Sequence, residues 1–336
     1  MKDLSDQLPI WEEVYCIETM SIHLRYRSVV LLLINVGLCL TQSKSLEYDT
    51  IVSFGDANSD TGNTYKLTGN QWPPPPYYLG RFSDGPLWVE RLNVSNLLNY
   101  AYADATTDSE WSTDNIPGTN LTAPGLRQQI NMYKNSTNLR QTDYSRTLYV
   151  IWIGLFDYFG DGDLNASTII RRLSRGIDDL IRIGAKTLLV VNQPPFRAYP
   201  GLYNGEMGEL FDLWTSEHND NLSQSIENFR KNLPQTTFHL LDVHSLIRDI
   251  LVNSSAFGIT NVTNCWSTFN GTIIPLCSNS NTFLFLDEFY FTTSVHQLIA
   301  DRARNLLLTS NGRIPYAFSS ALLMMISAIV WSKNFI

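Results

Sequence analysis

The segment Ile51-Val-Ser-Phe-Gly-Asp-Ala-Asn-Ser-Asp-Thr-Gly-Asn63 decides the fold of this chain. It begins as a short apolar run and continues into a polar stretch with two glycines. Such a change is typical of a buried strand that ends in a loop. Ala57 therefore lies just past the carboxyl end of a strand predicted at 50–54.

The same alternation of strand and helix continues along the 336 residues. Strands are predicted at 50–54, 99–102, 147–153, 187–191 and 238–243, and helices at 87–98, 167–182 and 209–232. Five short apolar strands separated by helices predict an α/β fold with a parallel sheet covered on both faces. Ligands bind at the carboxyl ends of such strands, where Ala57, Phe156 and the segment after Val191 are expected.

Several segments, in a fixed order, carry a resemblance to a known family. They are 51–63, 80–90 (GRFSDGPLWVE), 99–108 (NYAYADATTD), 124–130 (PGLRQQI), 150–157 (VIWIGLFD) and 285–299 (FLDEFYFTTSVHQLI). From about residue 49 to about residue 302 the chain resembles the GDSL/SGNH esterases and lipases, in their extracellular fungal-type branch. The resemblance implies a three-layer α/β/α, flavodoxin-like fold with a five-stranded parallel sheet.

Active members of that family hydrolyse carboxylic esters, removing acyl or acetyl groups from lipids, carbohydrates or small molecules. A serine after the first strand attacks, a histidine activates it, and an aspartate three residues earlier orients the histidine. The oxyanion is held by the serine N–H, a glycine N–H and an asparagine side chain.

Four of these five positions differ in this chain. Ala57 replaces the serine, Tyr290 the histidine, Asp104 the glycine and Phe156 the asparagine, and only Asp287 is retained. A methyl group cannot attack, a phenol with a pKa near 10 is a poor base at neutral pH, and a phenyl ring donates no hydrogen bond. Losing the nucleophile or base costs on the order of 10⁶ in rate. The pattern predicts a catalytically inactive pseudoenzyme.

The change at Ala57 taken alone also fits an engineered trap, but changes at four separated positions favour natural loss. A rearranged, weakly active site would need another pair, and Ser59 with His296 is the candidate. We expect Ser59 to lie in the first turn of a helix as a cap, and His296 to be packed on a helix at 293–304. His244, two residues after Asp242 at a strand end, is predicted to be a surface or structural histidine.

Other retained polar residues are expected to hold loops in place by hydrogen bonding without chemistry. They are Asp56, Asp60, Asn63 and Asp157. The aromatic replacements suggest two outcomes. Phe156, Tyr290 and Phe291, with Trp152 nearby, would line the old cleft and bind a sugar ring or an acyl chain, or would merely fill a disused pocket.

Three functions therefore remain open: a non-catalytic binding protein that retains a cleft, a weak esterase, and a structural glycoprotein. The expected ligand is a carbohydrate or an acyl ester, and no cofactor or metal is expected. The net charge of −8 argues against nucleic acid, because phosphate binding requires a basic face.

The two ends predict a secretory route. Residues 29–40 (VVLLLINVGLCL) follow two arginines and precede a polar stretch, as in a signal peptide, although a buried helix or signal anchor is the alternative. Met20 is a natural start for such a signal, as an alternative to Met1. Residues 317–331 form a second apolar run, either a GPI signal or membrane tail, or a docked terminal helix. The expected division is 1–46, 47–309 (the hydrolase-like domain) and 310–336, with membrane association only through the last.

Sequons and cysteines agree with an extracellular or cell-surface location. Glycosylation is expected at Asn93, Asn120, Asn135, Asn165, Asn221, Asn253, Asn261 and Asn270. Cys16 and Cys39 lie in the segments expected to be removed, which leaves Cys265 and Cys277 as a predicted disulfide in an oxidising compartment.

Overall fold

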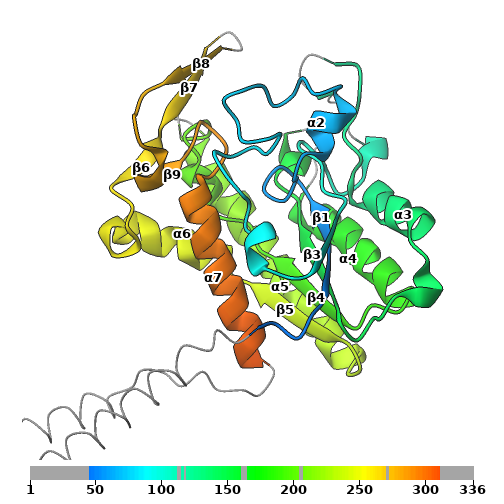
Figure 1. The fold of residues 1–336 in the computed structure, drawn as a ribbon. Coiled ribbons are helices and arrows are strands. Elements are labelled where there is room, and N and C mark those ends of the chain that lie inside the picture. Colours follow the sequence, from blue (N-terminus) through cyan, green and yellow to red (C-terminus); the bar gives the residue numbers. More distant parts are fainter. Residues whose placement is uncertain are drawn as a thin grey trace, which may run out of the picture. The chain divides into compact units, whose positions relative to one another are not determined.

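Five parallel strands form the central sheet of the fold (Figure 1). They are β1 (Thr50–Gly55), β2 (Asn96–Asn99), β3 (Thr147–Trp152), β4 (Thr187–Val191) and β5 (Thr237–Leu241). Their order in the sheet is β2-β1-β3-β4-β5, and every neighbouring pair is parallel. This is the flavodoxin-like order, so the predicted fold class is confirmed.

The computed structural model describes residues 45–111, 115–116, 119–159, 165–203, 207–269 and 272–310. From Leu46 onward these residues belong to one unit with its own core. The apolar runs at 29–40 and 317–331 lie outside the described residues, as do Cys16, Cys39 and Asn270.

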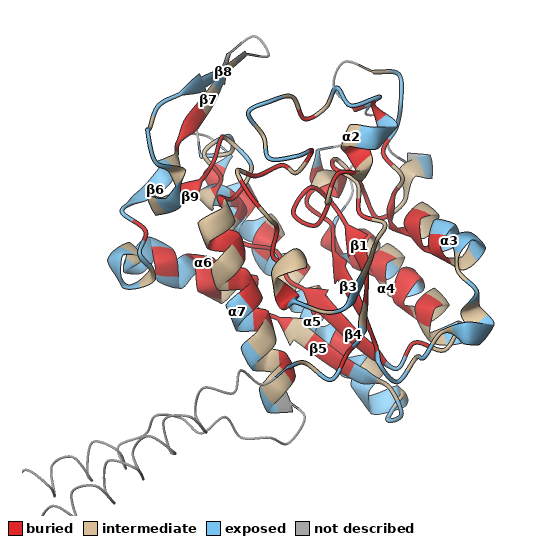
Figure 2. Cartoon of the chain, viewed as in Figure 1, coloured by how far each residue is buried: buried red, intermediate tan, exposed pale blue. Residues whose placement is uncertain are grey.

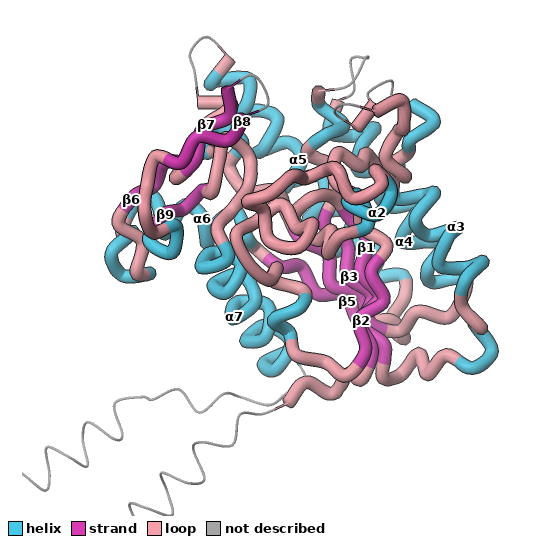
Figure 3. Tube along the Cα trace, turned by 45° about the horizontal axis from the view of Figure 1, so that its top comes forward, coloured by secondary structure: helices cyan, strands magenta, loops and turns pink. Residues whose placement is uncertain are grey.

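Helices cover both faces of the sheet, and Figure 3 shows them on either side of the strands. The helices are α2 (Asn63–Leu67), α3 (Leu126–Ser136), α4 (Ala166–Arg182), α5 (Gly208–Asn232), α6 (Val243–Val252) and α7 (Thr293–Ser310). The predicted helices at 167–182 and 209–232 are confirmed within a residue. No helix was predicted at 243–252, where α6 begins after the cap residue Asp242, and the strand predicted at 238–243 ends at Leu241 instead.

Alternating side chains of the strands divide the core into two layers. Ile51 and Val150 point to the side of α6 and α7, whereas Val52 and Ile151 point to the side of α3, α4 and part of α5. Figure 2 shows that the buried residues follow the strands of the sheet. Both faces of the sheet are therefore buried from water, as expected for parallel strands.

Two small sheets lie beside the central one. β6 (Asn261–Asn264) pairs with β9 (Phe283–Phe285), and β7 (Trp266–Phe269) forms an antiparallel hairpin with β8 (Thr272–Pro275). A disulfide joins Cys265 to Cys277 across the base of this hairpin, with the two Cα atoms 5.1 Å apart. The predicted cysteine pair is confirmed, although the hairpin itself was not predicted.

The prediction of a helix at 87–98 is wrong. Only a short 3-10 turn forms, at Glu90–Leu92, and Asn93 ends it with a left-handed backbone (φ 56°). The chain then enters β2, whose Leu97 pairs with Ile51. β2 therefore begins and ends three residues earlier than the strand predicted at 99–102, because pairing with β1 outweighs the helical apolar pattern.

Within the described residues, no helix combines the length and the apolar character needed to cross a membrane. In the same part of the chain, no group of three or more His, Cys, Asp or Glu side chains is arranged to hold a metal ion.

Candidate functional site

The turn that follows β1 is built around Gly55. This residue has a positive φ of 154°, and a Cβ there would lie 2.2 Å from the carbonyl oxygen of Trp152 on the neighbouring strand. The side chain of Gln129 fixes the same residue from the other side: its Oε1 accepts from Gly55 N, and its Nε2 donates to Gly55 O, both at 2.9 Å. The turn can therefore be made only with glycine, and it holds Ala57 at the end of the strand.

Asp60 organises the loop after Ala57. Its carboxylate accepts from the backbone N–H groups of Gly62 (2.9 Å), Asn63 (2.6 Å) and Thr64 (3.1 Å) at the start of α2. It also accepts from Ala103 N at 3.1 Å, in the loop that follows β2. One buried carboxylate thus joins the two loops that would supply the nucleophile and an oxyanion donor.

The other retained polar residues also hold loops in place, as predicted. Asn63 Nδ2 donates to the carbonyl oxygens of Asn99 and Ala101, both at 2.9 Å. Asp157 accepts from the N–H and the hydroxyl of Thr107. Burial raises the pKa of Asp157 to about 6, although the hydrogen bonds from Thr107 oppose the shift.

Ala57 is covered by aromatic side chains. Only 1% of its surface is exposed, and it forms a cluster with Phe82 and Ala103 against which Trp72 and Tyr290 pack. The rings of Phe82 and Tyr290 lie 4.9 Å apart between their centroids. The position that holds the nucleophile in active relatives is thus part of a small apolar core.

Asp287 has acquired a partner that the sequence did not indicate. Tyr77 Oη donates to Asp287 Oδ2, while Asp287 Oδ1 accepts from the N–H groups of Phe289 and Tyr290 at 2.9 Å each. The histidine that this aspartate orients in active relatives is absent, and the Tyr77 hydroxyl donates to the carboxylate instead. Burial raises the pKa of Asp287 to about 6, and the bonds from Tyr77 and the backbone oppose this shift.

We expect Tyr77→Phe to destabilise the protein more as the pH rises. Because the folded pKa of Asp287 lies above its ordinary value of 3.8, the folded state binds the extra proton between about pH 4 and pH 6, and stability falls as the pH rises through that window. Without the Tyr77 hydroxyl the pKa rises further, so the fall extends to higher pH. The expected loss is about 1 kcal/mol near pH 5 and about 2–3 kcal/mol near pH 8, measured by urea unfolding.

A matched control is Tyr133→Phe, which removes a buried hydroxyl that contacts the Tyr149 hydroxyl at 2.9 Å. No carboxylate takes part in that contact, so its cost should not change with pH. If Tyr77→Phe lowered the free energy of unfolding equally at pH 5 and pH 8, the Tyr77 hydroxyl would not stabilise the charged form of Asp287, and the prediction would be wrong.

Two further acids lie close to the old site. Asp104 takes a left-handed backbone (φ 60°), which explains the family glycine at this position and which aspartate tolerates better than most residues. Burial raises the pKa of Asp56 to about 7, hydrogen bonds from Asn58 oppose the shift, and the nearby charge of Asp104 adds to it. Burial also raises the pKa of the Tyr290 phenol well above its ordinary value, and the nearby charge of Asp104 raises it further. This environment disfavours a developing oxyanion.

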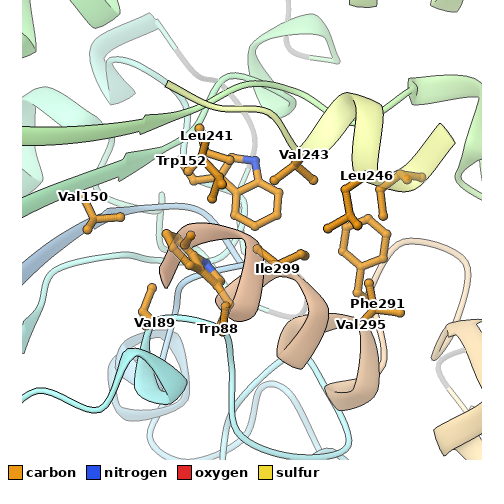
Figure 4. Close-up of a cluster of buried hydrophobic side chains, with 14 of the residues drawn as sticks. Trp88, Val89, Val150, Trp152, Leu241, Val243, Leu246, Phe291, Val295 and Ile299 are labelled. Carbon is orange, nitrogen blue, oxygen red and sulfur yellow. The ribbon is translucent and has the colours of Figure 1, made fainter. Parts of the chain in front are cut away.

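The aromatic residues predicted to line the cleft do not all do so. Trp152 and Phe291 are fully buried, and Figure 4 shows them among Val243, Leu246 and Ile299 of the core. Both are core residues, so the prediction that Phe291 lines the cleft is wrong. Trp152 was placed near the cleft only by its position in the sequence. Phe156 is only partly buried and packs against that same core rather than the Ala57 cluster.

In the described part of the chain, no hydrogen bond joins Ser59 to His296. Ser59 precedes α2, which begins at Asn63, so its expected place in the first turn is wrong. Its Oγ accepts from Trp88 Nε1 at 3.2 Å. His296 is 1% exposed on α7, as predicted, and burial lowers its pKa to about 3, so it remains neutral at pH 7. His244 is partly exposed on α6, consistent with the predicted surface or structural role.

Tyr77, Phe82 and Gln129 were not identified as site residues from the sequence. Tyr77 lies 210 positions from Asp287, and no local pattern links the two. Phe82 and Gln129 lie within the segments 80–90 and 124–130 that carry part of the family resemblance, and that was the available signal for both.

A family model described as GDSL-like Lipase/Acylhydrolase matches residues 51–303. The chain belongs to the GDSL family. The match spans nearly all of the sheet, the turn after β1 and the Asp287 segment, so the fold is that of the family.

Curated relatives agree with the family. The GDSL chain is 26% identical over 244 residues to a phosphatidylcholine-sterol acyltransferase of Aeromonas hydrophila, covering 69% of this chain and 70% of that protein. It is 23% identical over 320 residues to acetylajmalan esterase 2 of Rauvolfia serpentina, covering 75% and 88% respectively. Among solved structures, a lipolytic G-D-S-L family protein of Veillonella parvula aligns with a TM-score of 0.43 at 13% identity, over 76% of this chain and 97% of that one.

Proposed function

We propose that this GDSL-family protein does not hydrolyse esters. The observation that carries the proposal is the environment of Ala57, which is 1% exposed beneath the rings of Phe82 and Tyr290. An acyl carbonyl would have to approach this point for the family reaction to occur, and the residue there offers no attacking atom.

The groups around Ala57 support the same proposal. The residue at the base position is a phenol whose pKa burial raises further, so it does not accept a proton at pH 7. The retained acid, Asp287, accepts from Tyr77 and two backbone N–H groups instead of orienting a histidine. The alternative pair is not favoured, because Ser59 accepts from Trp88 and His296 is buried.

The proposal is tested with p-nitrophenyl acetate and a longer p-nitrophenyl acyl ester. The unmodified chain is expected to release p-nitrophenol no faster than buffer does. Turnover that follows the protein through successive purification steps and is lost in Ser59→Ala would overturn the proposal and favour the rearranged site. Turnover that Asp287→Asn abolishes would show instead that the retained acid still takes part in catalysis.

The proposed role is recognition of a carbohydrate or an acyl ester without its cleavage. The fold keeps the strand ends at which α/β proteins bind ligands, while the reacting groups of the family are absent. Since the Ala57 cluster occupies the centre of the old site, the recognition surface is proposed to lie elsewhere along the same edge of the sheet.

We also propose a secretory route, with a glycosylated chain at the cell surface or outside the cell. Six of the eight sequon asparagines are exposed: Asn93, Asn120, Asn135, Asn165, Asn253 and Asn261. Asn221 on α5 is partly buried. The disulfide between Cys265 and Cys277 supports an oxidising compartment. Membrane association is proposed only through the segment after residue 310.

A further inference from the structure

A cavity of about 1010 Å³ opens at the carboxyl ends of β4 and β5. Its walls come from the loop after β4, from α5 and α6, and from β6. It shares no lining residue with the cluster of Ala57, Phe82 and Ala103. Its volume is at the upper end of the range of about 300–1,000 Å³ that is usual for small-molecule sites.

The floor of the cavity is held in place by asparagine side chains. Asn192 Oδ1 accepts from Val243 N (2.8 Å) and His244 N (3.0 Å), and its Nδ2 donates to Asp242 at 2.8 Å. Asn219 of α5 likewise exchanges hydrogen bonds with the backbone of Gln193, at 2.8 and 2.9 Å. A site held by such bonds loses little entropy when a ligand binds.

Other side chains around the cavity are available to a ligand. Arg248 makes no ion pair with any residue in the part of the chain that the structure describes. Arg197 and Asp212 form an ion pair of 3.1 Å with both side chains about half exposed, at 51% and 56%. Tyr203 is 67% exposed and offers a ring face.

The charged, polar and apolar side chains that line the cavity favour some classes of ligand over others. Donors (Arg248) and acceptors (Asp220) line the same cavity as apolar surface from Tyr203, Pro195 and Pro200. An acyl chain would remove charged groups from water without replacing their hydrogen bonds, at a cost of several kcal/mol. A polyanion would be repelled by the three aspartates of the lining, and a polycation would be repelled by its two arginines.

We propose that this cavity binds a neutral oligosaccharide. Sugar hydroxyls both donate and accept hydrogen bonds, so they match the polar side chains among the walls. The apolar faces of sugar rings match the larger, apolar part of the lining, which includes Tyr203 and the prolines. The inference rests on the proposed function, recognition without cleavage, and it assigns that recognition to a place outside the family's catalytic position.

The test uses the full chain and four neutral trisaccharides: maltotriose, cellotriose, mannotriose and N,N′,N″-triacetylchitotriose. At least one is expected to show saturation transfer by NMR at millimolar concentration, followed by a measurable dissociation constant in calorimetry. Tyr203→Ala and Arg248→Ala are each expected to weaken binding about tenfold. Matched controls are Tyr78→Ala and Arg182→Ala, whose side chains are exposed and do not line the cavity.

Absence of saturation transfer with all four trisaccharides, in protein whose circular dichroism shows it folded, would overturn the inference. Binding that survives both cavity variants unchanged would overturn it as well, because the sugar would then bind elsewhere. Neither result bears on ester hydrolysis, which is measured separately with the p-nitrophenyl esters, so failure of the inference and failure of the proposed function remain distinguishable.

Discussion

The combined variant Ala57→Ser, Asp104→Gly, Phe156→Asn and Tyr290→His is expected to hydrolyse p-nitrophenyl acetate on the order of 10³ faster than the unmodified chain. Ala57→Ser alone is expected to stay at the background rate. The turn around Gly55 still holds position 57 at the end of β1, but a serine there has no base, and the nearby acids Asp56 and Asp104 disfavour a developing oxyanion. The nucleophile, the base and the oxyanion donors act together, so restoring the serine alone is not expected to restore the rate.

Tyr77 limits what this restoration achieves. It donates to Asp287 Oδ2, and Asp287 Oδ1 is already used by two backbone N–H groups. A histidine at position 290 must therefore displace Tyr77 to be oriented by Asp287. Adding Tyr77→Phe to the four changes is expected to raise the rate by a further factor on the order of 10.

The rates are measured with the initial velocity of p-nitrophenol release, and the variants are checked for folding by circular dichroism. Tyr77→Phe in the otherwise unmodified chain is the control, and it should remain inactive. If Ala57→Ser alone matched the combined variant, positions 104, 156 and 290 would not be lost partners of the nucleophile.

The sequence predicted the sheet because its signals are local. The apolar runs near β1, β3, β4 and β5 are short, bounded and separated by helical patterns, so neighbouring residues alone define them. β2 was misplaced because residues 87–98 also fit a helical period, and only pairing with β1 decides between the two.

Side-chain orientation at the site was predictable only in part. The retained polar residues hold loops as expected, since their partners lie within the family segments. Phe291 was assigned to the cleft because it adjoins Tyr290 in sequence, but the turn before α7 directs it into the core. Alternation along β3 directs the nearby Trp152 into the core as well. The Tyr77–Asp287 bond joins residues 210 positions apart, and no spacing rule predicts it.

Asp60→Ala is expected to lower the free energy of unfolding by at least about 3 kcal/mol, although position 60 does no chemistry in any version of the site. The carboxylate is fully buried and accepts from four backbone N–H groups. Alanine would leave the N–H groups of Gly62, Asn63 and Thr64 without this acceptor, whereas Ala103 N also donates to Thr64 Oγ1 at 2.9 Å. A buried unpaired donor costs about 1–3 kcal/mol. Asp60→Asn keeps one acceptor oxygen and should fall between wild type and Asp60→Ala.

The measurement is urea unfolding followed by tryptophan fluorescence, with the midpoint and slope fitted separately. Asp143→Ala is the control, because Asp143 also accepts from a backbone N–H, that of Ser145, but on the exposed surface, and its midpoint should hardly move. A midpoint for Asp60→Ala equal to that of Asp143→Ala would mean that water replaces the carboxylate. The loop would then be held by Gln129 and Asn63 instead, and Asp60 would not account for the stability of the turn.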